Sequence, residues 1–378
     1  MTYQPCANRR VHKIVDLSII NHNLQLLEQL LPDTIVMPVV KANAYGHGMV
    51  EVSKHLEKQK RRFFGVAFAD EALQLRKQGI TSDILVMGVS QPESIAELIE
   101  QRIVFAVSNL DTIFLAERIC AQSGCIANVH VKFNTGMNRL GMSSSDLPVL
   151  YEALEKSPRV KLTGVFSHFA CADEPTHQSN QLQLTKFNEI LTRLEKNGID
   201  AGIKHICNSA GAINFPGAKF DMVRIGIAMY GCSPSEDTTL LAGMKPSLNL
   251  LGKVAHVIEV KPGDSVSYGG TWVAEKSGIV ANVPIGYGDG YMRNLSNGKG
   301  KIICKGKEFP IIGRICMDQL MFFSESPDIV IGDVCHLLGQ HEGHSITAEE
   351  LAMNARTIPY EILTSLNDRL ETKYYTDN

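Results

Sequence analysis

The sequence lacks any cysteine spacing that would build a metal site or a disulfide framework. Its nine cysteines are scattered over 378 residues, and no two of them form a CxxC pair. An odd number of irregularly spaced cysteines is typical of a protein from a reducing compartment. Cys120 and Cys125 lie far in sequence from any pair of histidines or cysteines with zinc-ligand spacing, so no metal site is expected.

Long apolar runs and an excess of charge of either sign are also absent. No segment is apolar for long enough to cross a bilayer, and the polar N-terminal residues contain no signal-peptide core. The formal net charge of -3 gives no electrostatic reason to expect a nucleic acid partner. We therefore expect a cytoplasmic protein that binds neither a membrane nor a nucleic acid.

The first two-thirds of the chain alternates between short β-branched runs and helical periods. Apolar residues at helical spacing, such as those of residues 20–31 and 181–197, predict helices between the strands. The predicted strands are residues 35–41, 63–68, 84–88, 103–107, 128–133, 161–167, 203–207 and 221–224. Strands that alternate with helices form a parallel sheet, and eight of them favour an α/β fold of the (β/α)8 TIM-like barrel type over an open sheet.

The pattern changes after about residue 244. Strand-like runs at 252–260, 265–274, 278–284, 301–304 and 329–337 are separated by turn signals and contain little helix. Thr347-Ala-Glu-Glu matches the capping box that opens a late helix. We predict two domains, a barrel over residues 1–244 and a mainly-β domain over residues 245–378.

Unusual polar residues follow the predicted barrel strands, where barrel enzymes carry their catalytic groups. Lys41 ends an apolar strand, and partial desolvation there would lower its pKa and make it a competent Schiff-base amine. Lys132 and Arg139 flank the loop after the fifth strand, and His168 ends the sixth. Taken singly, Lys41 could be a strand-end lysine that extends to solvent, and His168 a core histidine.

The loops after the seventh and eighth strands are the usual phosphate site of such barrels. Asn208 and Ser209 follow the seventh strand, while Arg224, Gly226 and Ile227 lie at the eighth. Ser209 with Gly226 and Ile227 fits that role, although Gly226 alone could be a turn residue. The joint occurrence of these residues at successive strand ends favours an active site.

These residues belong to motifs that resemble those of bacterial alanine racemases. The motifs are Val-Val-Lys41-Ala-Asn-Ala-Tyr45-Gly-His-Gly, Lys132-Phe-Asn-Thr-Gly-Met-Asn-Arg139, Ser167-His168-Phe, Asn208-Ser209-Ala, Arg224-Ile-Gly-Ile-Ala-Met-Tyr-Gly231, Val-Ser-Tyr268-Gly-Gly-Thr, Pro-Ile-Gly-Tyr287-Gly-Asp-Gly-Tyr291, Gly-Arg-Ile-Cys-Met317-Asp318 and Pro-Tyr360-Glu. They occur in the order of that family along nearly the whole chain.

The resemblance implies a homodimeric enzyme that uses pyridoxal 5'-phosphate (PLP) to interconvert L-alanine and D-alanine for peptidoglycan. Lys41 would form the Schiff base with PLP, and Tyr268 would enter from the partner subunit as the second base. The implied cofactor-binding residues are Tyr45, Ser209, Gly226, Ile227 and Tyr360 at the phosphate end, together with Lys41, Arg139, His168, Asn208 and Arg224. Arg139 and Met317 would bind the substrate, Tyr287 would line the entrance, and Lys132 would carry a carbamyl group.

Two positions depart from the family pattern. Asn134 stands where many relatives have Asp, and Asn-Asp-Arg369-Leu stands where an Arg-Val-Pro-Arg pattern is common, which leaves the role of the tail open.

Three alternatives are less favoured. A PLP amino-acid decarboxylase of the same fold is expected to place an acidic residue where Arg224 lies. A racemase of broader specificity tends to be exported, whereas the N-terminal residues of this sequence contain no export signal. A non-catalytic PLP-binding barrel lacks the second domain, so the presence of Tyr268 in a second domain argues against it.

Overall fold

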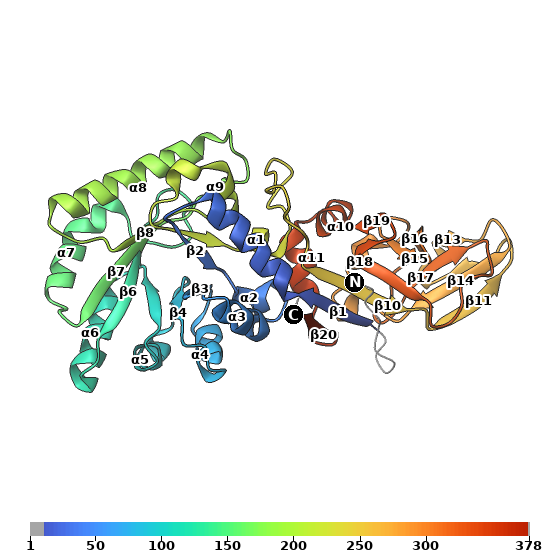
Figure 1. The fold of residues 1–378 in the computed structure, drawn as a ribbon, viewed down its shortest axis with the longest axis horizontal. Helices are drawn as coiled ribbons and strands as arrows, with labels where there is room; N and C mark the ends of the chain where they lie inside the picture. The colour runs from blue at the N-terminus through green and yellow to red at the C-terminus, as the bar shows by residue number, and fades with distance from the viewer. Residues whose placement is uncertain (1–10, 377–378) are drawn as a thin grey trace.

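The computed structural model describes residues 11–376, which form a barrel beside an elongated β-rich part (Figure 1). The barrel strands are β2 (Ile35–Pro38), β3 (Phe63–Val66), β4 (Asp83–Val86), β5 (Val104–Val107), β6 (Ala127–Lys132), β7 (Val160–Phe166), β8 (Ile203–His205) and β9 (Met222–Ile225). The barrel helices are α1 (Leu17–Leu30), α2 (Lys41–Tyr45), α3 (Met49–Lys58), α4 (Ala69–Lys77), α5 (Pro92–Glu100), α6 (Leu110–Ser123), α7 (Leu147–Glu155), α8 (Gln178–Lys196) and α9 (Ser209–Asn214), with 3-10 turns η1 (Ser144–Asp146), η2 (Pro216–Ala218) and η3 (Ile227–Tyr230).

The predicted barrel is confirmed, and each of the eight predicted strands overlaps an observed one. Six strands, β3 to β8, pair in chain order and in parallel, and β2 pairs in parallel with β9. A bridge between Val39 and Gly65 joins β2 to β3. The Asp221 N–H donates to Lys204 O at 3.0 Å and the Arg224 N–H to Cys207 O at 3.1 Å, which closes the ring between β8 and β9.

The β-rich part contains β1 (Val11–Asp16), β10 (Leu248–Lys253), β11 (His256–Val260), β12 (Ser265–Val266), β13 (Trp272–Val273), β14 (Gly278–Val283), β15 (Lys301–Cys304), β16 (Lys307–Ile312), β17 (Leu320–Ser324), β18 (Val334–His341), β19 (His344–Ile346) and β20 (Glu371–Tyr375). It also contains α10 (Ala348–Ala355), α11 (Pro359–Ser365) and the 3-10 turns η4 (Tyr268–Gly270), η5 (Tyr287–Asp289) and η6 (Arg293–Leu295). Thr347 caps α10 as predicted, because its hydroxyl accepts from the Glu350 N–H at 3.1 Å.

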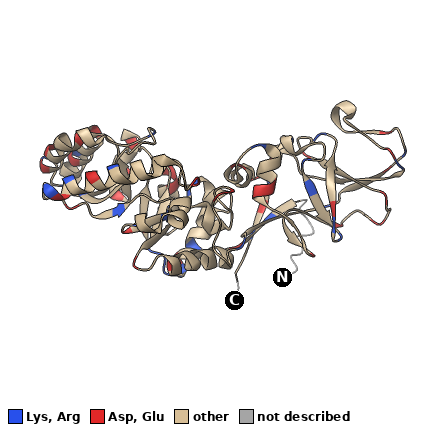
Figure 2. Cartoon of the chain, turned by 90° about the horizontal axis from the view of Figure 1, so that it is seen from above, with Lys and Arg blue, Asp and Glu red and all other residues tan. Residues whose placement is uncertain are grey.

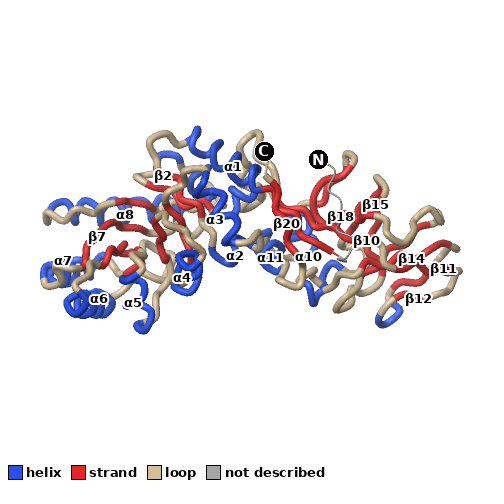
Figure 3. The backbone as a smooth tube through the Cα atoms, turned by 60° about the horizontal axis from the view of Figure 1, so that its bottom comes forward, coloured by secondary structure: helices blue, strands red, loops and turns tan. Residues whose placement is uncertain are grey.

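The large sheet of the β-rich part includes the first strand of the described chain, which sequence reasoning did not expect. Its order is β11-β14-β17-β16-β15-β18-β10-β1-β20, and β1 pairs antiparallel with β10 and parallel with β20. Figure 3 shows these strands running together on one side of the molecule, away from the barrel. Residues from both ends of the chain therefore complete one sheet.

Three of the predicted β runs were wrong in detail. The run at 329–337 is a strand only from Val334, where β18 begins. Residues 252–260 are split between β10 and β11, and residues 265–274 form a hairpin of β12 and β13 instead of one strand. The hairpin turns at residues 267–270, where Ser267, Gly269 and Gly270 adopt positive φ. A strand cannot continue through such conformations.

Charges of both signs are interspersed along the chain (Figure 2), in keeping with the small net charge. Within residues 11–376 no helix combines the length and apolarity needed to cross a membrane. The same residues contain no cluster of three or more His, Cys, Asp or Glu side chains arranged to hold a metal ion.

Helix α1 fastens the end of the barrel to the start of the β-rich part through one buried amide. The Asn23 side chain donates to Met229 O at 3.0 Å and to Lys245 O at 2.8 Å, and it accepts from the Lys245 N–H at 3.0 Å. Asn23 is fully buried, and its amide is satisfied by these three hydrogen bonds to the backbone. The amide thus fixes η3 relative to the following segment.

We predict that Asn23→Ala lowers the free energy of unfolding by about 2–4 kcal/mol, because it removes three hydrogen bonds and leaves the buried Met229 O without this partner. Denaturant unfolding of the variant and of Gln25→Ala, an exposed position on the same helix, provides the comparison. Equal stability of the two variants would contradict the assigned role of Asn23.

Candidate active site

Lys41 begins a left-handed helical turn at the carboxyl end of β2. Ala42, Asn43, Ala44 and Tyr45 have φ values of 51, 53, 54 and 53°. Consecutive left-handed residues other than glycine cost roughly 1–2 kcal/mol each, so this turn persists only because its surroundings impose it. The turn begins at Lys41 and ends at Tyr45, whose side chain is buried.

The carboxylate of Glu71 holds the turn from the neighbouring strand end. It accepts from the Ala42 N–H at 2.7 Å through one oxygen, and from the Ala67 and Phe68 N–H groups at 2.7 and 3.1 Å through the other. The Asn43 side chain also accepts from the Met49 N–H at 2.8 Å. Glu71 therefore joins the loops after β2 and β3.

A buried lysine secures the other end of the turn. The Lys13 ammonium donates to Gly46 O at 3.1 Å and to Leu366 O at 3.2 Å. It ties β1 and the segment after α11 to the loop that carries Lys41. Burial lowers the pKa of Lys13.

The loops after β8 and β9 form a small cradle at the ends of α9 and η3. The Ser209 hydroxyl accepts from the Gly226 N–H at 2.9 Å, and the Asn208 side chain caps α9 by accepting from the Gly211 N–H at 2.9 Å. A Cβ at Gly226 would lie 2.4 Å from the Tyr45 hydroxyl oxygen, so only glycine fits there. Ile227 begins η3, and the Tyr360 ring lies 5.9 Å from that of Tyr45.

Arg224 is buried on β9 and is held by four acceptors. It donates to His205 Nδ1 at 2.8 Å, Ser167 O at 2.9 Å, His168 Nδ1 at 2.9 Å and Ile206 O at 2.8 Å. Because a guanidinium can only donate, both histidine Nδ1 atoms must accept and therefore carry no proton. Burial, reinforced by the Arg224 charge, lowers the pKa of His168 and of His205 well below the usual range, which keeps both rings neutral.

The neutral His205 ring extends this hydrogen-bond network from Arg224 to His130. With Nδ1 accepting, its proton lies on Nε2, which donates to His130 Nδ1 at 2.9 Å. Burial lowers the pKa of Arg224 to about 10, so the guanidinium remains charged at neutral pH. Within residues 11–376 Arg224 forms no salt bridge with a carboxylate. A buried cation without a counter-ion is costly and favours an electron-rich ligand beside it.

Three further cations, Lys41, Lys132 and Arg139, act on the same site as Arg224. Burial and the charges of Arg139 and Arg224 lower the pKa of Lys41, with Glu71 acting in the opposite direction. Burial and the charges of Arg224, Arg139 and Lys41 lower the pKa of Lys132 to about 8. The site is therefore electropositive and can accept an anionic ligand, and Lys41 is easier to deprotonate than an ordinary lysine.

Asn134 organises the loop that leads from Lys132 to Arg139. Its side-chain oxygen accepts from the Gly136 and Asn138 N–H groups at 3.1 and 3.0 Å, and its amide nitrogen donates to Asn138 Oδ1 at 2.9 Å. A carboxylate could accept the first two hydrogen bonds but could not donate the third. The Asn at this position is thus matched to Asn138.

The other predicted site residues lie in the β-rich part and do not meet this cluster within one chain. Tyr268, Tyr287 and Met317 are 68%, 42% and 53% exposed. The strands β12 and β13, which flank Tyr268, lie at the far end of the molecule from α2, which begins with Lys41 (Figures 1 and 3).

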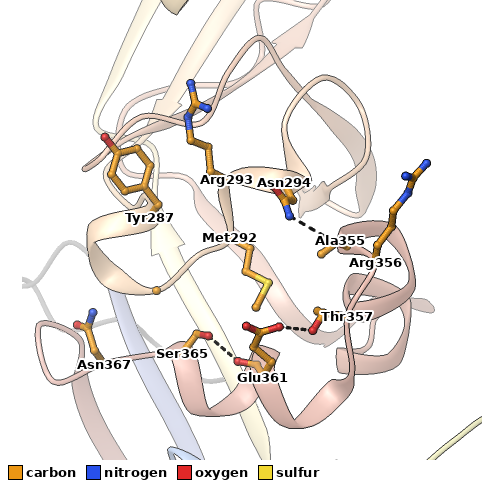
Figure 4. Close-up of a pocket in the computed structure, with 11 residues that line it drawn as sticks. Tyr287, Met292, Arg293, Asn294, Ala355, Arg356, Thr357, Glu361, Ser365 and Asn367 are labelled. Atoms are coloured by element: carbon orange, nitrogen blue, oxygen red, sulfur yellow. Dashed lines mark hydrogen bonds between the residues drawn. The ribbon is translucent and has the colours of Figure 1, made fainter.

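Backbone hydrogen bonds connect the Tyr287 and Met317 loops, because the Tyr287 N–H donates to Cys316 O at 3.1 Å and the Gly288 N–H to Met317 O at 2.8 Å. Tyr287 also lines an open cavity between η5, η6 and the helices α10 and α11 (Figure 4). Arg293 and Arg356 are also among the residues that line the cavity, and Figure 4 shows their side chains extending outward.

The tail that sequence reasoning left unassigned braces the loops of Tyr287 and Met317. The Arg369 guanidinium donates to Asp318 Oδ1 at 2.6 Å and lies 3.5 Å from Asp289 Oδ1. The Asn367 side chain donates to Gly288 O at 3.0 Å. Arg369 thus links the two aspartates that follow Tyr287 and Met317.

Two family models match the chain: the N-terminal domain of alanine racemase over residues 15–234 and the C-terminal domain of alanine racemase over residues 247–374. The chain belongs to the alanine racemase family. It is 38% identical to an alanine racemase of Carboxydothermus hydrogenoformans, over 97% of this chain and 100% of the relative, and 37% identical to alanine racemase 2 of Caldanaerobacter subterraneus subsp. tengcongensis, over 95% of this chain and 93% of the relative. The structure of the alanine racemase from Streptomyces lavendulae superposes with a TM-score of 0.94 at 36% identity, covering 100% of this chain and 99% of that chain.

Alanine racemases are PLP-dependent enzymes, and the site described above fits PLP. Ser209, Gly226 and Tyr45 form a cradle that could take the phosphate, at a position where only glycine leaves room. The cations Arg224, Arg139, Lys41 and Lys132 match the negative charge of the cofactor. Lys41 is the desolvated amine among them.

Sequence reasoning missed Glu71, Lys13 and the function of Arg369. Glu71 follows Phe-Ala-Asp at the start of α4, a first-turn carboxylate that could have been recognised as a helix-capping residue. Nothing local in the sequence indicates the contacts of Lys13 and Arg369, because both side chains bind partners far along the chain.

We predict that Glu71→Gln weakens PLP binding by about tenfold and lowers the free energy of unfolding by about 1–3 kcal/mol. The amide can accept through only one of the two oxygens that now hold the left-handed turn and the loop after β3. PLP titration by absorbance and chemical denaturation measure both effects. Asp70→Asn, an exposed neighbour on α4, serves as the control, and PLP affinity equal to that of this control would refute the prediction.

Proposed function

We propose that this chain is an alanine racemase that interconverts L-alanine and D-alanine by proton transfer at two opposite faces of Cα, with Lys41 and Tyr268 as the two bases. The observation that carries the proposal is the desolvated Lys41 amine within an electropositive barrel mouth, in a chain that belongs to the alanine racemase family throughout its length. PLP, when bound, supplies the electron sink that makes the Cα proton of alanine acidic.

The resemblance to alanine racemases and the placement of the barrel residues support the following roles. Lys41 Nζ takes or returns the proton on one face of Cα, and Tyr268 Oη does so on the other. Tyr45, Ser209, Gly226, Ile227 and Tyr360 would hold the phosphate end, with Asn208 among the cofactor-binding residues, while His168 would pack against the pyridine ring and Arg224 would face its nitrogen. Arg139 and Met317 orient the substrate carboxylate, and Tyr287 lines the entrance.

Arg224 favours racemisation over the rival decarboxylase activity. A charged guanidinium opposes protonation of the pyridine nitrogen, whereas an acidic residue would promote it. The four acceptors that bind Arg224 hold the charge in place.

We propose a homodimer because the two bases are separated within one chain. Tyr268 and Met317 are largely exposed on the β-rich part, and a second copy of the chain that brought them to the barrel mouth would complete the site. In this arrangement residues 1–244 supply the PLP-binding part and residues 245–378 supply the second base. We further propose that the enzyme acts in the cytoplasm and that its D-alanine serves peptidoglycan synthesis.

Mixing two inactive variants tests both the bases and the shared site. Lys41→Ala and Tyr268→Phe each remove one base, so each variant alone should lose D-alanine formation by at least about a hundredfold. If the sites are shared, a hybrid dimer has one intact site, and random mixing after mild dissociation should restore about a quarter of wild-type activity. No recovery in confirmed hybrid dimers would exclude a shared site. Inversion or decarboxylation of another amino acid, with alanine untouched, would overturn the substrate assignment.

Lys132 carbamylation is a separate prediction. A pKa of about 8 leaves a substantial fraction of neutral amine to react with carbon dioxide, and the negative carbamate would lie among the charges of Arg139 and Arg224. With ¹³C-bicarbonate, the wild-type protein should show a carbamate carbon signal that strengthens between about pH 7 and 9, as the amine loses its proton. Lys132→Arg should lack the signal, and identical spectra of the two proteins would refute carbamylation at this residue.

A further inference from the structure

Ser267, the residue directly before Tyr268, has a backbone conformation that is ordinarily restricted to glycine. Its φ and ψ are 68 and -179°. Residues with a Cβ persist in this region only where their surroundings impose it, and such residues concentrate at functional sites. Within the same turn Gly269 and Gly270 take up the other positive φ values, so the strain falls on the one non-glycine residue that adjoins the tyrosine.

The Ser267 side chain explains how the conformation is held. Its hydroxyl donates to Arg314 O at 2.6 Å, and its oxygen lies 3.5 Å from Cys316 Sγ. The backbone at residue 313 approaches so closely that a Cβ on Gly313 would lie 2.9 Å from Ser267 Cβ. One side chain thus fastens the β12–β13 hairpin to the strand-connecting segment 313–316.

The segment that holds Ser267 also contacts the loops of the other exposed site residues, Tyr287 and Met317. Cys316 O accepts from the Tyr287 N–H at 3.1 Å, and Met317 follows directly in sequence. The guanidinium of Arg314 lies against the other side of the turn, 3.0 Å from the position of a Cβ on Gly269. The segment 313–317 is therefore a common support for Tyr268, Tyr287 and Met317.

We propose that Ser267 is a positioning residue for the second base: its hydroxyl, anchored on Arg314 O, fixes the strained turn that sets where Tyr268 projects. The proposal rests on the proposed role of Tyr268. The Tyr268 side chain is 68% exposed in the chain, so its place depends on the backbone of this turn. Ser267 itself need not touch the substrate.

Two substitutions separate the hydroxyl from the strain. Ser267→Ala keeps the Cβ and its strain but removes the anchor, and Ser267→Gly removes the anchor and the strain together. Both should lower kcat for racemisation by roughly 10–100-fold, as expected for a misplaced catalytic group, with PLP absorbance and melting temperature close to wild type. Ser265→Ala, an exposed serine in the same hairpin, is the control and should retain wild-type activity.

The isotope readout distinguishes a misplaced Tyr268 from general damage. In deuterium oxide, Lys41 can still remove the Cα proton of the enantiomer that presents it to Lys41 and return a deuteron to the same face. We therefore expect exchange without inversion to persist for one enantiomer in both Ser267 variants, while racemisation falls.

Two outcomes would count against this role for Ser267, and a third would count against the proposed function. A Ser267→Gly enzyme with wild-type racemisation would overturn the proposal, since the hydroxyl would then be dispensable. Loss of exchange for both enantiomers in step with racemisation would also overturn it. A wild-type enzyme that does not racemise alanine would instead refute the proposed function on which it rests.

Discussion

The left-handed turn at residues 42–45 is the constraint on which the active site depends. A right-handed helix at this point would carry Tyr45 away from Gly226, whereas the observed turn seats the Tyr45 hydroxyl where only glycine can face it. The turn is costly, and it is offset by contacts from three directions: Glu71 from the next strand end, Asn43 within the loop, and Lys13 from the first strand. Cofactor binding and stability are therefore supported by the same few hydrogen bonds.

The second organising feature is the positive charge at the barrel mouth, where Arg224 forms no salt bridge with a carboxylate of residues 11–376. Burial and the charges of Arg139 and Arg224 lower the pKa values of Lys41 and Lys132, and the two histidines bonded to Arg224 stay neutral because that guanidinium occupies their Nδ1 atoms. An arrangement of this kind is poorly satisfied until an anionic cofactor enters. The barrel supplies the cations of the site, while the exposed Tyr268 and Tyr287 lie on the β-rich part.

The sequence predicted the barrel well because its signals are local. Each strand is a short apolar run, and five of the eight are followed or ended by unusual polar residues, so strand positions and site residues could be predicted together. What escaped prediction depends on distant partners: β1 and β20 pair across nearly the whole chain, and Glu71 acts on a loop 29 residues earlier. The run at 265–274 was taken for a strand because apolar residues at both ends hid the turn that carries Tyr268. The family motifs named the site residues, but local pattern could not supply the network that holds them.

The position of β1 between β10 and the edge strand β20 has a consequence for how the molecule assembles. Lys13 can be buried with both of its acceptors only when Leu366 has reached its place, and β1 gains its parallel neighbour only from residues 371–375. Contacts of such long sequence separation form late, because closing a long loop costs entropy before it brings any stabilisation. During synthesis the barrel strands can therefore pair while β1 still has an open edge. The loop behind Lys41 would stay incompletely supported until the last strand of the chain arrives, which makes the closing of this sheet the step at which the site matures.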